Sequence, residues 1–114
     1  MNKYLDLYYQ EEKINNQAYY HGTSSALKII NNEILPPDET GVIREDIRDY
    51  NKDVVYITTS HDLAYKYAIK AVSKFGGHPV IYEVKPDYDS LAHRMDEEYT
   101  SNYAIITDVN EYYI

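Results

Sequence analysis

The sequence predicts an α+β domain in which a small, split and twisted, mainly antiparallel sheet is flanked by helices. Segments rich in β-branched and aromatic residues, which suit strands, outnumber the segments whose apolar residues recur at helical spacing. The connections between these segments are irregular and do not repeat the alternation of strand and helix that builds a parallel sheet. Because 114 residues are enough for one modest core, residues 1–114 are expected to form a single domain.

The first part of the chain predicts two helices around a strand. Apolar side chains fall at helical intervals over residues 2–16 and predict an amphipathic helix. Aromatic residues predict the end of a strand at residues 19–21, and Gly22 follows with a backbone that a ligand can approach. Helical spacing over residues 26–30 then predicts a short helix, for which a preceding serine would accept the first amide protons.

A loop is expected after this short helix. Pro36 and Pro37 prevent a helix from continuing, and residues 34–35 form only a short extended piece. The apolar residues of the segment 41–53 show only weak helical periodicity. Both a loop and a short helix therefore remain possible there.

The middle of the chain predicts a strand followed by a helix. Residues 54–58 are β-branched or aromatic throughout, which is typical of a strand. Thr59 and Asp62 fit a capping box in which an aspartate replaces the usual glutamate. The helix is expected over residues 62–72, and the glycine pair at 76–77 supplies its end.

The last third of the chain predicts two further strands. Residues 79–86 alternate in hydrophobicity and have a proline at each end, as strands do. Residues 87–102 predict a connection with one helical turn. Residues 103–109 predict another strand, which residues 110–114 either extend or follow with a last edge.

The composition excludes several classes of function. The net charge of −8 leaves no surplus of basic residues to displace counterions from phosphates, so direct binding of nucleic acid is not expected. The absence of cysteine excludes disulfides and thiolate zinc sites, and the four histidines lack the spacing of zinc ligands, so no metal is expected. No apolar run is long enough to span a membrane, and the N-terminal segment is too polar for a signal peptide, which predicts a cytoplasmic protein.

Three motifs follow one another in an informative order. They are the tetrapeptide Tyr20-His21-Gly22-Thr23, the segment Val55-Tyr56-Ile57-Thr58-Thr59 that leads into the predicted helix, and the strand Val80-Ile81-Tyr82-Glu83-Val84. In this order and spacing they resemble the ADP-ribosyltransferase family of the His-Tyr-Glu type, which includes diphtheria toxin and the poly(ADP-ribose) polymerases. The members that modify rifampin are the closest in size. The resemblance covers residues 19–114 and implies an ADP-ribosyltransferase-like fold with NAD as co-substrate.

The resemblance implies roles for five residues in binding NAD. His21 would hydrogen-bond the adenosine ribose, since a neutral imidazole both donates and accepts. Gly22 would hold the nicotinamide carboxamide through its backbone, and Thr23 would add a hydroxyl. Tyr56 would stack on the nicotinamide ring. Tyr67 matches a second aromatic position of the polymerase-like members, with packing in the core as the alternative explanation.

The family also needs a catalytic carboxylate near the start of a late strand. This group holds a ribose hydroxyl and stabilises the positive charge that develops on the sugar as the glycosidic bond breaks. Glu98 is the first choice, because it lies between the strand at 79–86 and the last strand, as the family order requires. Three alternatives stay open, namely Glu97, Asp89 and Glu111. Glu98, Tyr56 and His21 are thus the expected catalytic set.

Three functions are compared on these grounds. The resemblance implies a mono-ADP-ribosyltransferase that modifies an intracellular protein or a small molecule, such as a phage or mobile-element effector aimed at a host factor. The net charge of −8 instead favours an inactive acidic inhibitor or decoy that covers a basic surface of a host protein. The third function is that of an NAD-dependent RNA 2′-phosphotransferase, which the few arginines, Arg44, Arg48 and Arg94, support poorly.

Overall fold

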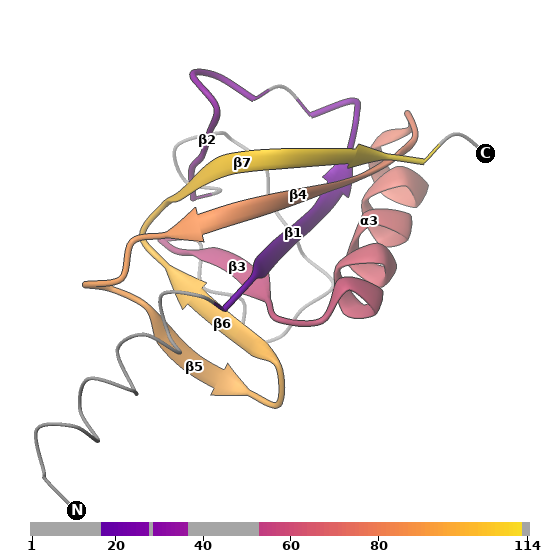
Figure 1. The fold of residues 1–114 in the computed structure, drawn as a ribbon. Coiled ribbons are helices and arrows are strands. Elements are labelled where there is room, and N and C mark those ends of the chain that lie inside the picture. Colours follow the sequence, from indigo (N-terminus) through magenta and orange to yellow (C-terminus); the bar gives the residue numbers. More distant parts are fainter. Residues whose placement is uncertain (1–16, 28, 37–52, 113–114) are drawn as a thin grey trace, which may run out of the picture.

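The computed structural model describes residues 17–27, 29–36 and 53–112 (Figure 1). The helix predicted over residues 2–16 lies outside these ranges, as does nearly all of the segment 41–53. Within the described ranges, no helix is both long and apolar enough to cross a membrane.

The described part of the chain has an α+β fold, with one helix and a seven-stranded, open, antiparallel sheet. The strand order is β2-β7-β4-β1-β3-β6-β5. The elements are β1 (Tyr19–Ser24), β2 (Glu33–Ile34), β3 (Val55–Thr58), α3 (His61–Phe75), β4 (Pro79–Pro86), β5 (Ala92–Met95), β6 (Glu98–Ser101) and β7 (Ala104–Glu111). The predicted fold class is therefore confirmed at the level of an α+β fold with an antiparallel sheet.

Strand β1 lies at the centre of the sheet and is paired very differently on its two sides. It pairs with β4 along its whole length. On the other side, it is in register with β3 at one pair only, Tyr20 opposite Thr58. In Figure 1, β1 and β3 meet near the start of β1 and run apart from there. The edges of β1 and β3 therefore diverge beyond Tyr20.

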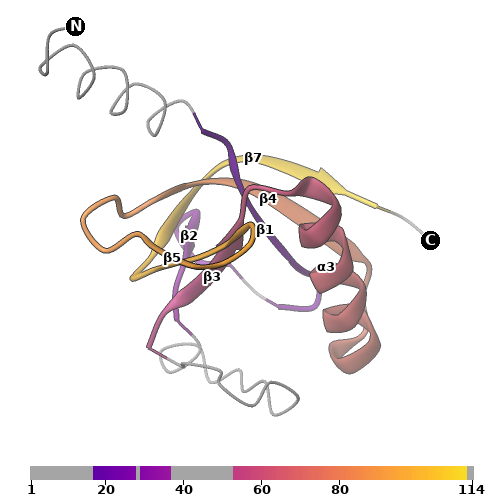
Figure 2. The same ribbon diagram turned by 90° about the horizontal axis from the view of Figure 1, so that it is seen from below.

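Helix α3 packs directly on β1, and Gly22 makes this possible. A Cβ atom at Gly22 would lie 1.7 Å from the main-chain oxygen of Ala64, so any side chain there would collide with the helix backbone. Ala64 and Ala68 are the buried residues of α3, and their small side chains allow the close approach. Figure 2 shows α3 beside β1 and the adjacent strand β4.

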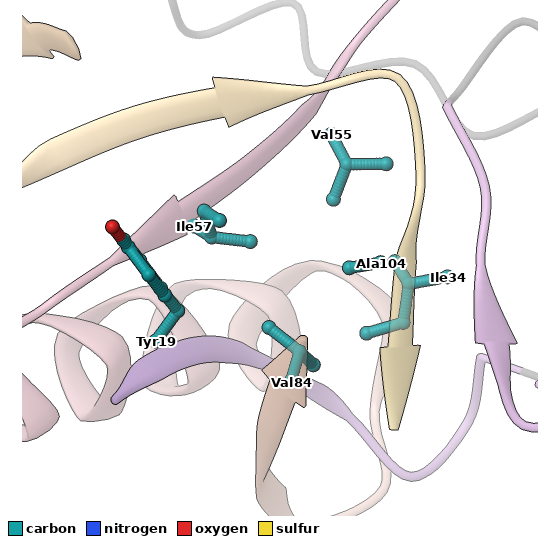
Figure 3. Packing of buried hydrophobic residues seen from close by; sticks show 6 residues of the cluster. All are labelled: Tyr19, Ile34, Val55, Ile57, Val84 and Ala104. Carbon is teal, nitrogen blue, oxygen red and sulfur yellow. The ribbon is translucent and has the colours of Figure 1, made fainter. Parts of the chain in front are cut away.

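The main hydrophobic core lies on the sheet and draws on five strands. Figure 3 shows its buried members, which are Tyr19, Ile34, Val55, Ile57, Val84 and Ala104. The Tyr19 ring meets the ring of Tyr99 edge to face, with 5.5 Å between the centroids. Burial, with smaller contributions from Tyr99 and Tyr88, raises the pKa of Tyr19 above its ordinary value.

The start of α3 differs from the prediction by one residue. The N-cap is Ser60, whose side chain accepts a hydrogen bond from the backbone N–H of Leu63 at 3.1 Å. The predicted capping box at Thr59 is therefore wrong. Thr59 instead donates its backbone N–H to the main-chain oxygen of Glu97, which keeps it aligned with the sheet. The helix itself is confirmed and runs from His61 to Phe75.

The short helix predicted over residues 26–30 is also wrong. Strand β1 continues to Ser24, and a turn follows it. The side chain of Ser24 accepts from the N–H of Ala26 and donates to the main-chain oxygen of Gly76. The N–H of Ser25 donates to the main-chain oxygen of His78 at 2.9 Å. These bonds tie the turn to the segment after α3, and local helical spacing does not outweigh them.

The segment 87–102 contains a turn and then a hairpin over residues 92–101, in place of the predicted connection with a helical turn. Strands β5 and β6 pair antiparallel around a turn in which Asp96 has a positive φ of 45°. Strand β5 is an edge strand whose side chains are mostly exposed, namely those of Ala92, His93 and Met95. Because neither of its faces is apolar, the alternation that predicts a strand is missing.

The remaining strands agree with their predictions. The strand predicted over residues 54–58 is β3, and the one over 79–86 is β4. The strand predicted from residue 103 is β7, and it continues to Glu111. The segment 110–114 thus extends this strand as far as the described residues reach.

Candidate functional site

His21 and Tyr56 lie side by side where β1 and β3 diverge. The Nδ1 atom of His21 is 2.9 Å from the main-chain oxygen of Tyr56. Because a carbonyl oxygen only accepts, Nδ1 must carry the proton in this bond, which in a neutral ring makes Nε2 the acceptor nitrogen. The bond spans 35 residues of sequence and fixes the imidazole beside β3.

Tyr56 is the second residue of β3 and is buried, with 9% of its surface exposed. The guanidinium carbon of Arg94 lies 5.1 Å from the centre of its ring. At this distance the cation is attracted by the negative face of the ring. The aromatic face of Tyr56 therefore supports a planar cation that comes from β5.

Glu98 is the first residue of β6 and pairs with Thr58 at the end of β3. Its Oε2 accepts a hydrogen bond of 2.6 Å from the hydroxyl of Tyr67 on α3. Its Oε1 forms an ion pair with Arg94. Both oxygens of the carboxylate are thus oriented by partners from two elements, α3 and β5.

These contacts join five residues into one network, which we call the Tyr56–Glu98 site and define as His21, Tyr56, Tyr67, Arg94 and Glu98. They come from β1, β3, α3, β5 and β6. The side chains of Arg94 and Glu98 are 25% and 13% exposed, so the ion pair is largely withdrawn from water. Four of the five residues were predicted from the sequence as site residues, and the structure brings them together.

Arg94 is the residue that sequence reasoning missed. In the sequence analysis, Arg94 was considered only as one of the few arginines that could bind an RNA phosphate. The register of β5 and β6 shifts between His93 and Met95, so Arg94 sits at a β-bulge. A bulge redirects a side chain, and Arg94 is half-buried between two exposed neighbours. The bulge could not be foreseen because the hairpin itself was not predicted.

The two other predicted ligand residues lie further along β1. The α carbon of Gly22 faces α3, where the helix backbone leaves no room for a side chain. Thr23 is buried and lies opposite Val80 of β4. The close packing of α3 on β1 is therefore sufficient to explain a glycine at position 22. The roles of Gly22 and Thr23 in binding NAD stay predictions.

The alternative carboxylates occupy other places. Glu97 is exposed in the turn of the hairpin, directly before Glu98. Asp89 is exposed in the turn after β4, where its N–H donates to the carboxylate of Asp87 at 3.2 Å. Glu111 lies at the end of β7 and contacts His78 at 3.1 Å, and strands β4 and β1 separate β7 from β3. Glu98 is the candidate whose carboxylate is bonded to two residues of the Tyr56–Glu98 site.

The Tyr56–Glu98 site combines an aromatic face, an oriented carboxylate and an imidazole. A fixed carboxylate beside an aromatic face stabilises a positive charge that forms between them, because neither group has to reorganise. The imidazole adds a hydrogen-bonding group at the diverging edge of β1. Among the residues that the structure describes, no cluster of three or more histidine, aspartate or glutamate side chains could hold a metal ion.

No family model matches the chain, and no curated protein matches it.

Proposed function

We propose that this protein is a mono-ADP-ribosyltransferase that uses NAD as co-substrate. The observation that most directly supports this function is the convergence of His21, Tyr56 and Glu98, which are spread over 78 residues of sequence but connected through the contacts of one site. A His, a Tyr and a Glu on three different strands, here β1, β3 and β6, are the set that the sequence resemblance implies. The diverging strands β1 and β3 are the point at which a split sheet of the ADP-ribosyltransferase kind would open.

Different residues of the site bind different parts of NAD. The aromatic face of Tyr56 supports the nicotinamide ring, and His21 hydrogen-bonds the adenosine ribose. The carboxylate of Glu98 holds a hydroxyl of the ribose that carries nicotinamide. Tyr67 keeps that carboxylate in place through its hydroxyl, 2.6 Å from Oε2.

The reaction exchanges one bond at the ribose for another. The bond between C1′ and the nicotinamide nitrogen breaks, and its electron pair leaves with nicotinamide. The positive charge left on the sugar is stabilised by the negative charge of Glu98. A nucleophile of the acceptor then bonds to C1′ and loses its proton to solvent or to the carboxylate. Nicotinamide and ADP-ribosylated acceptor are the products.

Release of nicotinamide from NAD tests this function. We expect the wild-type protein to release nicotinamide in the presence of a host lysate and to transfer labelled ADP-ribose to a component of it. Tyr56→Ala and His21→Ala should each lower the release at least about 100-fold, because each removes a group that positions NAD. Tyr103→Ala and His78→Ala are matched controls, since they remove the same side-chain types elsewhere, and should keep the wild-type rate.

The acidic decoy is the second candidate, and the position of Arg94 favours it. Arg94 lies over the Tyr56 ring and pairs with the Glu98 carboxylate. A protein that catalyses no reaction could keep an arginine in this position at no cost to its function. If the wild-type protein releases no nicotinamide, and Tyr56→Ala and His21→Ala leave its biological effect unchanged, the transferase is excluded and the decoy is favoured.

A further inference from the structure

Arg94 contacts both of the groups that would handle the nicotinamide end of NAD. Its guanidinium lies over the ring of Tyr56, 5.1 Å from the centroid, and forms an ion pair with Glu98. The β-bulge between His93 and Met95 allows it to reach inward from an otherwise exposed edge strand. One side chain therefore covers the aromatic face and neutralises the carboxylate.

The shape and charge of this side chain indicate what the position accepts. A guanidinium is planar and positively charged, and it stacks on aromatic rings. The nicotinamide ring of oxidised NAD is also planar and positively charged, whereas the ring of the reduced form is neutral. Tyr56 and Glu98 together thus make a receptor for a planar cation, in which Arg94 and oxidised nicotinamide present the same chemistry.

We propose that Arg94 is an internal occupant of the nicotinamide position, which the oxidised nicotinamide ring displaces when NAD binds. This inference rests on the proposed function and adds a way in which the binding of NAD at this site is regulated. Displacement exchanges one cation for another, so Glu98 keeps a counter-charge throughout. The neutral, reduced ring would leave Glu98 without one, which makes the site selective for oxidised NAD.

The occupant lowers the affinity for any ligand of this position. Only the fraction of molecules in which Arg94 has moved away is competent to bind, and the observed dissociation constant rises by the inverse of that fraction. A single cation–π contact and one ion pair whose side chains are 25% and 13% exposed correspond to a competent fraction on the order of a tenth. Removal of the guanidinium should therefore raise the affinity about tenfold.

Binding of two small probes tests this occupant without any chemistry at the ribose. The first probe, 1-methylnicotinamide, is a planar cation, and the second, nicotinamide, is its neutral counterpart. Both are titrated by calorimetry or protein NMR into the wild-type protein, Arg94→Gln and Lys85→Ala. Lys85 is an exposed residue of β4, so its removal makes the same change in net charge away from the site.

We expect Arg94→Gln to bind both probes about tenfold more tightly than the wild type, because the competent fraction limits every ligand of this position alike, and to bind 1-methylnicotinamide more tightly than nicotinamide, because only the cation pairs with Glu98. Lys85→Ala should bind both probes as the wild type does. The occupant is refuted if Arg94→Gln shows no gain for 1-methylnicotinamide, or if only 1-methylnicotinamide gains, because loss of one positive charge beside the site would then explain the change. If circular dichroism shows that Arg94→Gln is unfolded, Arg94→Lys replaces it. Lysine keeps the positive charge of arginine but lacks its planar guanidinium. We therefore expect a gain of about threefold in the affinity for 1-methylnicotinamide, and no gain refutes the occupant.

The outcome is separable from that of the proposed function, because release of nicotinamide from NAD is measured on the same proteins. NAD cleavage by the wild type without a gain of Arg94→Gln for 1-methylnicotinamide refutes the role of Arg94 and leaves the transferase standing. A gain without NAD cleavage by either protein refutes the transferase and leaves a planar-cation site that Arg94 covers.

Discussion

The carboxylate of Glu98 is the most constrained group of the Tyr56–Glu98 site. Its two oxygens are bonded to residues of different elements, Tyr67 of α3 and Arg94 of β5. The two partners have different consequences for the proposed reaction. In the proposed reaction, Tyr67 would orient the carboxylate without competing with NAD, whereas Arg94 would occupy the position of the nicotinamide ring. Loss of the first should therefore slow the reaction, and loss of the second should strengthen binding.

Tyr67→Phe tests the orienting role at the scale of one hydroxyl. We expect nicotinamide release to fall about tenfold in kcat with little change in KM, because a hydrogen bond to a charged group is lost while the ring remains. Tyr65→Phe is the control, since Tyr65 lies on the same helix and is exposed, and it should keep the wild-type kcat. An unchanged kcat for Tyr67→Phe would show that Tyr67 serves packing alone.

At the scale of elements, two boundaries decide how the site is assembled. The first is the end of β3, where Thr58 is still paired with Glu98 and Ser60 already caps α3. Only one residue separates the two, so the strand that carries Tyr56 and the helix that carries Tyr67 are held in a fixed relation. The second is the bulge of β5, which directs Arg94 inward.

Ser60→Ala tests the first boundary. The side-chain oxygen of Ser60 accepts from the N–H of Leu63, and its loss should reduce the free energy of unfolding by about 1 kcal/mol in urea denaturation. Thr59→Ala, which removes the neighbouring hydroxyl, should change it by only a few tenths of a kcal/mol, roughly the scale of a surface substitution. A larger loss for Thr59→Ala than for Ser60→Ala would place the cap at Thr59, as the sequence predicted.

The scale of elements also separates what the sequence could predict from what it could not. Residues 54–58 and 79–86 were predicted correctly because strands near the middle of a sheet have apolar residues that mark them. The exposed edge strand β5 has no such pattern. Similarly, the turn after β1 depends on bonds from Ser24 and Ser25 to a segment some fifty residues away, which local spacing cannot reveal.

At the scale of the whole molecule, strand order brings distant parts of the sequence to one place. The order β1-β3-β6 sets His21 beside Tyr56 and pairs the strand of Tyr56 with that of Glu98. The motifs predicted these three residues, but not that they would be neighbours, because strand order is a long-range property. The sequence likewise left four carboxylates open, and only the contacts of Glu98 distinguish it from Glu97, Asp89 and Glu111.

The central claim is that the Tyr56–Glu98 site breaks the bond between ribose and nicotinamide with Glu98 as its carboxylate. The most direct test measures nicotinamide release from NAD by the wild type, Glu98→Gln and Glu97→Gln. The two variants make the same change at neighbouring positions, one within the site and one in the exposed turn. We predict that Glu98→Gln lowers the release about 100-fold and Glu97→Gln less than about twofold, because in the proposed reaction only the carboxylate at the site would face the developing charge. Equal rates for the two variants, or no release by the wild type, would contradict the claim.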